Sequence, residues 1–166
     1  MSKAGMTKSQ TFKKRSIRLV HGIFDEGVLK SFKKSEPYFV MEGRPDLLSS
    51  QTTIKTLSKS KIIPTIIADN MAGFLFYKDL VKEVRLSYQY DDDSGALCDI
   101  GSLILGVLAK THGVPVYLYK GPLRRRFLAP EEDVLKFNGK AVAAKDTRVY
   151  GPLVEWLANE YITKKY

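Results

Sequence analysis

The sequence has little cysteine and histidine and no long apolar run. Its single cysteine, Cys98, excludes a disulfide within the chain, which suits a reducing, cytoplasmic compartment. The two histidines, His21 and His112, are too few for a zinc-binding pattern. No apolar run approaches the roughly 18 residues of a membrane span. No hydrophobic block follows the N-terminal charges, so we expect neither a membrane segment nor a secretory signal.

Two phosphate-binding motifs are also missing. No G-x-G-x-x-G follows the first expected strand, and there is no Walker loop, which disfavours a dinucleotide or nucleoside triphosphate site. Asp91-Asp92-Asp93 lacks the spacing of a calcium loop, and three carboxylates before Ser94-Gly95 are typical of a solvated turn. The sequence therefore predicts no bound metal and no cofactor.

Positive charge is abundant, because 27 Lys and Arg face 18 Asp and Glu, for a net charge of +9. Residues 1–15 are polar, basic and aperiodic, so we expect a flexible tail before a single domain at 16–166. Arg124–Arg126 form a second basic group. A solubilising tail is one interpretation, and weak, salt-sensitive contact with nucleic acid is the other.

Short β-branched runs alternate with helical patterns from Ser16 onward. We expect strands at 16–20, 38–41, 62–68, 84–88 and 114–119, and helices at 24–32, 47–59, 71–76, 98–110 and 152–163. This alternation is typical of a three-layer α/β domain with a mainly parallel sheet of about five or more strands. Residues 123–150 show little pattern beyond a turn at Phe137–Gly139, and wrapping over the sheet is one interpretation.

The loops that follow the strands should carry the functional residues. In parallel sheets with right-handed crossovers these loops share one edge, and ligands bind there. The expected loops are His21-Gly22, Glu42–Pro45, Asp69-Asn70, Tyr88–Gly95 and Lys120–Arg126.

Several side chains at this edge are candidate ligand contacts. Asp69 and Asn70 stand between a strand and a helix, where both are strong N-caps, or where one caps and the other contacts a ligand hydroxyl. Arg44 offers a bidentate fork for phosphate or carboxylate. Ser50 and Gln51 lie near the start of the next helix, where free N–H groups and hydroxyls bind anions.

Two other residues have simple structural interpretations. Cys98 lies near an expected helix start, which can lower a thiol pKa, but its apolar neighbours favour a buried, inert thiol. His112 precedes Gly113 at the expected end of a helix, which explains it without a catalytic role.

Three colinear stretches carry a family resemblance: EGRPDLLSSQTTIKTL at 42–57, IPTIIADNMAG at 63–73, and CDIGSLILGVLAKTHGVPVYLYKGP at 98–122. They resemble the C-terminal domain of the family that holds the regulatory subunits of translation initiation factor 2B, methylthioribose-1-phosphate isomerase and ribose-1,5-bisphosphate isomerase. The resemblance implies a Rossmann-like domain and sugar-phosphate or nucleoside monophosphate ligands. By position it carries over Arg44, Asp69 and Asn70 to the ligand pocket.

The chain departs from the family pattern at the catalytic groups of the isomerases. The resemblance implies a cysteine after an early strand, but that strand here leads to His21-Gly22. It also implies an aspartate in a later loop, and counting back without gaps from Ile100-Gly101 places Tyr88 there. The Asn-Lys pair of the family falls on Cys98-Asp99. A tyrosine holds no negative charge at neutral pH, so Tyr88 is a candidate ligand contact and we expect no catalytic residue among these positions.

Three functions remain open from the sequence. The first is a non-catalytic initiation factor 2B-like domain that binds a sugar phosphate or nucleoside monophosphate, or serves as a regulatory or assembly module. The second is an aldose-ketose isomerase with relocated catalytic groups. The third is RNA or ribonucleoprotein binding through the tail and Arg124–Arg126. We favour the first, because the scaffold persists while the reactive residues do not.

The sequence also predicts a homodimer. The window Gly73–Lys78 (GFLFYK) is too apolar all round for a helix with a solvent-exposed face. Its second side must be covered by residues 123–150 or by another subunit, and exposed aromatic patches usually mark an interface.

Overall fold

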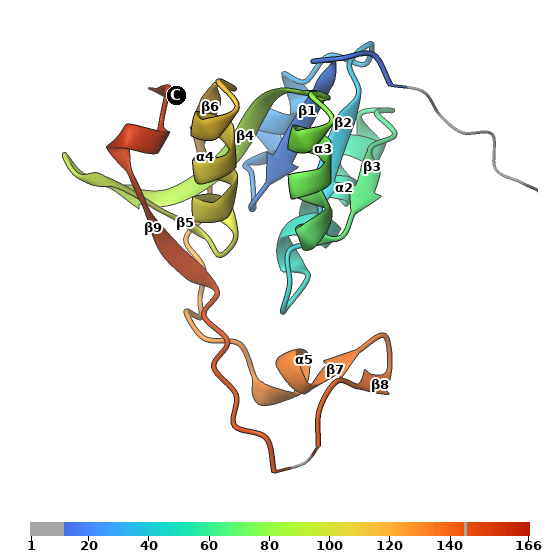
Figure 1. The fold of residues 1–166 in the computed structure, drawn as a ribbon, viewed down its shortest axis with the longest axis vertical. Helices are drawn as coiled ribbons and strands as arrows, with labels where there is room; N and C mark the ends of the chain where they lie inside the picture. The colour runs from blue at the N-terminus through green and yellow to red at the C-terminus, as the bar shows by residue number, and fades with distance from the viewer. Residues whose placement is uncertain (1–11, 145) are drawn as a thin grey trace, which may run out of the picture.

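The computed structural model describes residues 12–144 and 146–166 (Figure 1). Most of the expected tail therefore lies outside the described residues. At its end, Phe12 packs edge-on against Phe39 with ring centroids 5.1 Å apart, and Arg15 Nε lies 2.8 Å from Asp79 Oδ1. Across the described residues, no helix has both the length and the apolar character needed to cross a membrane.

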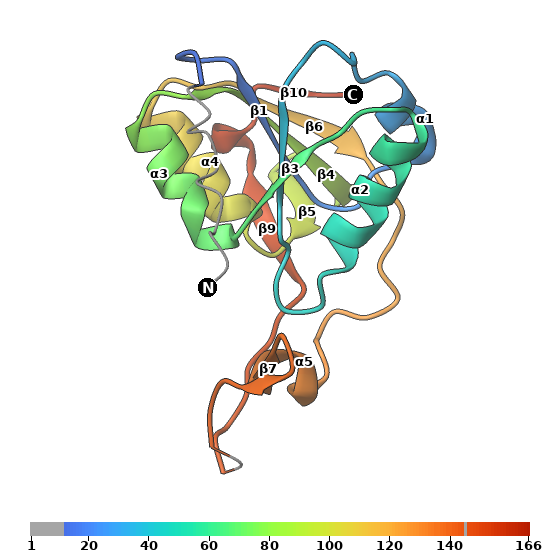
Figure 2. The ribbon, with the colours of Figure 1, turned by 90° about the vertical axis from the view of Figure 1, so that its right-hand side faces the viewer.

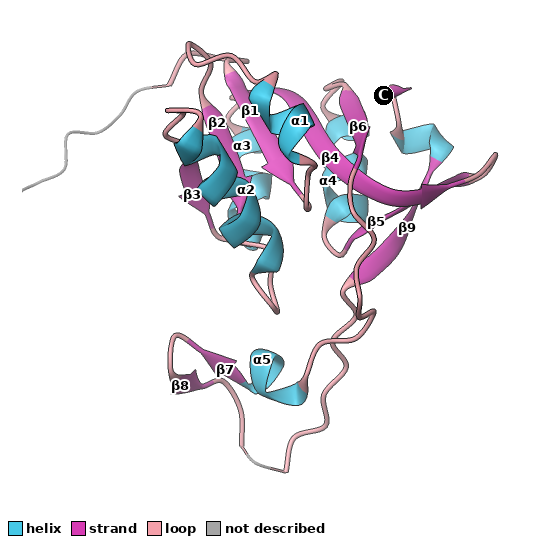
Figure 3. Ribbon diagram, turned by 180° about the vertical axis from the view of Figure 1, so that it is seen from behind, coloured by secondary structure: helices cyan, strands magenta, loops and turns pink. Residues whose placement is uncertain are grey.

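The main sheet has eight strands, and the helices lie on both of its faces (Figures 1 and 3). Its strands are β1 (Ile17–His21), β2 (Tyr38–Met41), β3 (Thr65–Ile67), β4 (Val81–Asp91), β5 (Gly95–Asp99), β6 (Val116–Lys120), β9 (Val154–Ala158) and β10 (Lys164–Lys165). The helices are α1 (Glu26–Lys30), α2 (Leu48–Lys59), α3 (Ala72–Tyr77), α4 (Ser102–Thr111) and α5 (Glu131–Leu135). Two 3-10 turns lie at Asp69–Met71 and Asn159–Tyr161, and β7 (Lys136–Phe137) pairs with β8 (Lys140–Ala141) in a separate hairpin.

The parallel part of the sheet has the strand order β10-β6-β4-β1-β2-β3. Strand β5 runs antiparallel to β4, and β9 runs antiparallel to β5. Helices α1 and α2 cover one face, and α3 and α4 cover the other (Figures 2 and 3). The three-layer, Rossmann-like α/β domain with a mainly parallel sheet is therefore confirmed.

The core divides into two clusters because alternate residues of a strand point to opposite faces. Leu19 of β1 packs into the cluster beneath α3 and α4, together with Leu86 and Leu105. Its neighbour Val20 packs into the cluster beneath α1 and α2, together with Leu57. Burial on both faces explains why β2 (YFVM) is a continuous hydrophobic run in the sequence.

The predicted helix at 98–110 is wrong at its start. Cys98 and Asp99 belong to β5, and Cys98 pairs with Tyr88 across an antiparallel ladder. The helix begins only at Ser102, after Gly101 takes a φ of 99° that breaks the strand. The expected strand-to-helix loop at Tyr88–Gly95 is instead the hairpin between β4 and β5.

The tip of this hairpin matches the solvated turn expected from its three aspartates. The Asp92 carboxylate accepts hydrogen bonds from the Ser94 N–H and O–H groups, both at 2.7 Å. These bonds lower the pKa of Asp92, and Asp91–Asp93 are all exposed.

The predicted helix at 152–163 is also wrong, because this segment forms β9 and a 3-10 turn. Leu157 is fully buried and lies opposite Ala96 of β5. Gly95 permits the close approach, since a Cβ there would lie 2.3 Å from the Leu157 carbonyl oxygen. Pairing with β5 thus overrides the helical spacing of the apolar residues.

Residues 122–152, which we call the arm, leave the sheet after β6 and return to it at β9 (Figure 1). The arm extends beyond the carboxyl ends of the strands rather than wrapping over the sheet. Arg44 links it to the domain, since its Nη1 donates to the Lys136 carbonyl at 3.3 Å and its guanidinium lies 4.8 Å from the Phe137 ring centroid. The predicted turn at Phe137–Gly139 is confirmed, with Asn138 and Gly139 at φ of 52° and 76°.

Candidate functional site

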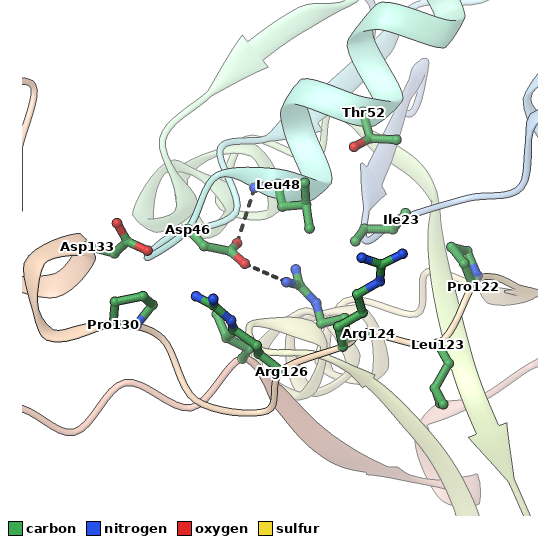
Figure 4. A pocket seen from close by; sticks show the side chains of 12 residues that line it. Ile23, Asp46, Leu48, Thr52, Pro122, Leu123, Arg124, Arg126, Pro130 and Asp133 are labelled. Carbon is green, nitrogen blue, oxygen red and sulfur yellow. Dashed lines mark hydrogen bonds and ion pairs between the residues drawn. The ribbon is translucent and has the colours of Figure 1, made fainter.

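A cavity of about 480 Å³ lies at the carboxyl ends of the parallel strands (Figure 4). It lies between the start of α2, Ile23 in the loop after β1, and the root of the arm. Its size falls within the range of small-molecule pockets, and its place is the one where parallel sheets bind ligands. The lining residues are Ile23, Asp46, Leu48, Thr52, Pro122, Leu123, Arg124, Arg125, Arg126, Pro130, Asp133 and Leu153.

Arg124 is the centre of a buried ion-pair network beside this cavity. Its Nε and Nη2 donate to the two carboxylate oxygens of Asp99, at 2.7 and 3.2 Å. Its Nη1 donates to Asp46 Oδ2 at 2.6 Å, and the other oxygen of Asp46 accepts from the Leu48 N–H at 3.1 Å (Figure 4). Arg124 is 8% exposed and Asp99 is 2% exposed. Geometry of this bidentate kind gives the strongest pairs between arginine and carboxylate.

Gln89 completes the network from the end of β4. Its Oε1 accepts from the Arg124 backbone N–H at 2.8 Å, and its Nε2 donates to Asp99 Oδ1 at 3.1 Å. The Asp99 carboxylate is therefore fully engaged by Arg124 and Gln89. Both carboxylates of the network are thus engaged in hydrogen bonds with Arg124.

Tyr88, the candidate at this strand end, lies on the other side of the sheet. It packs with Cys98 and Leu105 in the cluster beneath α3 and α4, and burial raises its pKa. Since side chains alternate along a strand, Ser87 and Gln89 point to the opposite face. The same alternation, read from the sequence, is the signal that could have selected Gln89 instead of Tyr88.

The end of β1 has no room for the side chain that the resemblance implies there. Gly22 has a φ of 104°, and a Cβ at this position would lie 2.1 Å from Ser87 Oγ. Thr53 Oγ1 donates to the Gly22 carbonyl at 3.1 Å. His21 Nε2 lies 2.7 Å from the Ile100 carbonyl oxygen, and because a carbonyl only accepts, this nitrogen carries the proton. His21 thus ties β1 to the loop before α4.

Asp69 positions a backbone loop, and the prediction that Asp69 or Asn70 caps the following helix is wrong. The Asp69 carboxylate accepts from the N–H groups of Gly43 and Arg44, at 2.9 and 2.8 Å. No side-chain hydrogen bond caps the 3-10 turn or α3, and Asn70 is exposed. Asp69 therefore fixes the loop after β2 from the neighbouring strand end.

Arg44 lines two further cavities, and the larger of them is rich in acidic residues. It measures about 760 Å³, and its lining includes Glu42, Asp46, Glu132 and Asp133 alongside Arg44 and Lys136. Burial, and then the charge of Asp69, raise the pKa of Glu42, while Arg44 opposes this. This acidic surrounding makes the second cavity less suited to an anion than the cavity beside Arg124.

The remaining two candidates lie on α2. Ser50 is buried, and its Oγ donates to the Leu47 carbonyl at 3.0 Å, while Gln51 is exposed. The six candidate residues therefore do not surround one cavity, and none of them lines the cavity beside Arg124. Sequence reasoning missed Asp46, Asp99 and Gln89 because their contacts depend on Arg124, which is distant from them in sequence.

Cys98 has the properties of an inert thiol. It is fully buried in β5, and burial, followed by the charges of Asp99 and Glu155, raises its pKa to about 12. A thiol with this pKa is almost wholly protonated near neutral pH and is a poor nucleophile.

We expect Cys98 to resist a thiol reagent such as DTNB at pH 8 in the native protein and to react stoichiometrically in guanidinium chloride. The physical reason is that burial keeps the reagent from reaching the sulfur and raises the thiol pKa, so that little reactive thiolate is present. Absorbance at 412 nm measures the reaction. Rapid, complete labelling of the folded chain would contradict this description of Cys98.

Replacing Arg124 tests the ion-pair network. We expect Arg124→Ala to lower the free energy of unfolding by about 3–5 kcal/mol, because it leaves the Asp99 carboxylate buried without its partner. Arg125→Ala is the matched control, since Arg125 is exposed, and a surface change of this kind costs within about 0.5 kcal/mol. Urea denaturation followed by circular dichroism measures both values, and equal effects of the two substitutions would contradict the network.

Comparison with curated proteins finds relatives that include several methylthioribose-1-phosphate isomerases. The methylthioribose-1-phosphate isomerase of Caldicellulosiruptor saccharolyticus is 30% identical over 140 residues, which are 75% of this chain and 40% of that protein. The enzyme of the same name from Thermus thermophilus is 30% identical and covers 75% of this chain and 42% of its own length. The chain thus spans less than half the length of these curated relatives.

Solved structures show the same fold. The translation initiation factor eIF-2B subunit delta from A. fulgidus aligns with a TM-score of 0.77 and 21% identity, over 93% of this chain and 52% of that one. The 5-methylthioribose 1-phosphate isomerase from Pyrococcus horikoshii aligns with a TM-score of 0.72 and 20% identity, over 92% of this chain and 49% of that one. A family model described as the initiation factor 2 subunit family matches residues 6–165. By sequence and by fold, the chain belongs to the initiation factor 2 subunit family.

Proposed function

We propose that this chain is a non-catalytic member of the family and that its cavity beside Arg124 binds a sugar phosphate or a nucleoside monophosphate. The observation that carries the proposal is that the charged side chains at the strand ends bind one another. Arg124 and Gln89 hold Asp99, and the end of β1 has Gly22 where the resemblance implies a cysteine.

Aldose-ketose isomerisation requires groups that move protons at the reacting carbons, and such groups must have access to the substrate. The chain's thiol, Cys98, is fully buried with its pKa raised to about 12. Of the carboxylates that line the cavity, Asp46 is bound to Arg124, which leaves Asp133. The alternative of an isomerase with relocated groups, which the names of the relatives favour, therefore depends on Asp133.

The cavity has the chemical character of a site for a phosphorylated molecule. Arg125 and Arg126 line it and are exposed, so their guanidinium groups are available to a phosphate. Ile23, Leu123 and Leu153 supply apolar surface for a sugar or base. Arg124 pairs with both Asp46 and Asp99, so the attraction for an anionic ligand comes from Arg125 and Arg126.

A regulatory or assembly role in translation initiation is the broader form of this proposal. It rests on the family description and on the likeness to the A. fulgidus initiation factor subunit. A domain that binds a ligand without converting it can transmit ligand binding to a partner through linked equilibria.

A panel of ribose phosphates and nucleoside monophosphates tests the ligand site by thermal shift, because a ligand that binds the folded state raises the melting temperature. We expect at least one of them to bind, and Arg126→Ala to weaken that binding by about 1–3 kcal/mol through the loss of a charge-assisted hydrogen bond. Arg148→Ala, an exposed arginine outside the cavity lining, is the control and should leave affinity unchanged. We also expect no turnover of methylthioribose 1-phosphate; turnover that Asp133→Asn abolishes would establish the isomerase alternative instead.

We also propose a homodimer, and exposed apolar residues on α3 and α4 support it. Phe76 is buried, whereas Phe74 of α3 and Ile104 of α4 are 56% and 59% exposed on neighbouring helices (Figure 1). The arm lies at the far end of the strands and does not cover these helices. A second copy of the chain would bury this apolar face.

We expect sedimentation at micromolar concentration to show a dimer, and the double variant Phe74→Glu/Ile104→Glu to sediment as a monomer of 18.7 kDa. The introduced charges would have to be buried in the interface, which is costly. Phe127→Glu in the arm, also at an exposed aromatic residue, is the control and should stay dimeric. A wild-type monomer, or a dimer that the double variant leaves intact, would contradict this surface.

A further inference from the structure

Charge is divided unevenly between the two edges of the sheet. The segments that lead into β1, β2, β3 and β4 lie at the edge opposite the arm and the cavity (Figure 3). They carry a set of exposed lysines that we call the lysine edge: Lys13, Lys14, Lys33, Lys34, Lys59, Lys61, Lys78 and Lys82. Acidic residues gather instead around the cavities and α5.

Arginines already bind the carboxylates close to the lysine edge. The pairs are Asp79 with Arg15 at 2.8 Å, Glu36 with Arg18 at 2.6 Å, and Glu83 with Arg85 at 2.6 Å. Within residues 12–144 and 146–166, no lysine of this edge takes part in an ion pair. The positive charge of the edge is therefore not balanced locally.

Helix dipoles account for only part of this charge. Lys59 lies in the last turn of α2, where a cation complements the negative end of the helix. Lys13 and Lys14 precede β1, and Lys33 and Lys34 lie in the loop between α1 and β2, outside the last turn of a helix. These four lysines need another explanation.

The topology arranges the lysines in a row. Strands β4, β1, β2 and β3 are adjacent in this order, and neighbouring strands lie about 4.8 Å apart. The loops before them thus present cations along about 15 Å of the edge. A row of regularly placed cations complements a polymer with regularly placed anions, and a nucleic acid backbone is such a polymer.

We propose that the lysine edge binds nucleic acid through its phosphate backbone. The interaction is independent of sequence, because lysine contacts to phosphates position the polymer without reading its bases. It uses the edge opposite the cavity and so does not depend on the proposed small-molecule ligand. It shares Lys13 and Lys14 with the expected tail, and it does not include Arg124–Arg126.

The composition of the edge favours nucleic acid over an acidic membrane. Stable membrane binding needs apolar insertion in addition to basic residues. Ile63, which is 95% exposed, is the large aliphatic side chain that the described loops expose here, and one such residue gives little insertion. Among the described residues, Lys78 is the one lysine of the edge that lies over aromatic rings, those of Phe74 and Tyr77. The other seven lysines make no such contact, which suits a phosphate-binding surface.

Fluorescence anisotropy with a labelled 20-base-pair RNA duplex and a 20-nucleotide single strand, between 50 and 200 mM salt, tests the proposal on the full chain. The variant Lys33→Glu/Lys34→Glu/Lys61→Glu reverses charge at the edge. The control Lys120→Glu/Lys140→Glu/Arg148→Glu makes the same change of net charge at exposed positions elsewhere. Both variants retain residues 1–11, so the basic N-terminal segment is constant.

We expect wild-type binding that weakens steeply with salt, because bound counterions are released. The edge variant should bind at least about tenfold more weakly at 50 mM salt and with a shallower salt dependence, whereas the control should stay within about threefold of wild type. Absence of binding by the wild type would overturn the proposal. Equal losses in both variants would show that net charge alone acts, and equally tight binding to phosphatidylserine vesicles or polyglutamate would overturn the assignment to nucleic acid.

Discussion

The strand-end site depends on one buried guanidinium. Arg124 joins the end of β5 through Asp99, the loop before α2 through Asp46, and the end of β4 through Gln89. Because all three partners are distant from Arg124 in sequence, this residue fixes the root of the arm against the sheet. A charge placed this deep is stable only when its hydrogen bonds are satisfied, so the loops around the cavity are tied to one arrangement.

The same network bears on whether the site can catalyse proton transfer. In a site that transfers protons, a carboxylate must be reachable and able to change its protonation state. Here Asp99 and Asp46 are held by Arg124, while Arg125 and Arg126 remain exposed at the cavity. The proposal that the site holds a phosphorylated ligand rests on these exposed guanidinium groups and on the apolar wall beside them.

The layered α/β fold was predictable because burial on both faces of a parallel sheet leaves continuous apolar runs that alternate with amphipathic helices. The two predicted helices that proved wrong share a cause. Around Cys98 and Leu157 the apolar residues recur at a spacing typical of helices, yet both residues lie in antiparallel strands, β5 and β9, which pair with each other. Pairing between segments that are distant in sequence is not visible in the local spacing of apolar residues. Asp69 was placed at the correct strand end, but its partners Gly43 and Arg44 come from another loop. Local pattern thus indicates where a side chain lies, whereas tertiary contacts decide what it binds.

We propose that the domain has two separate surfaces for anions of different size, the cavity beside Arg124 and the lysine edge. The cavity admits a small molecule, and the lysine edge presents an open row. The account of the cavity is tested most directly by NMR titration of the ¹⁵N-labelled chain with methylthioribose 1-phosphate, observing protein amides and ligand phosphorus together. The account predicts that amide shifts concentrate at Ile23, Thr52 and Leu123–Arg126 while the ligand signal stays that of the unreacted aldose phosphate. A growing signal of the ketose product, or amide shifts confined to Arg44 and Asn70, would contradict it.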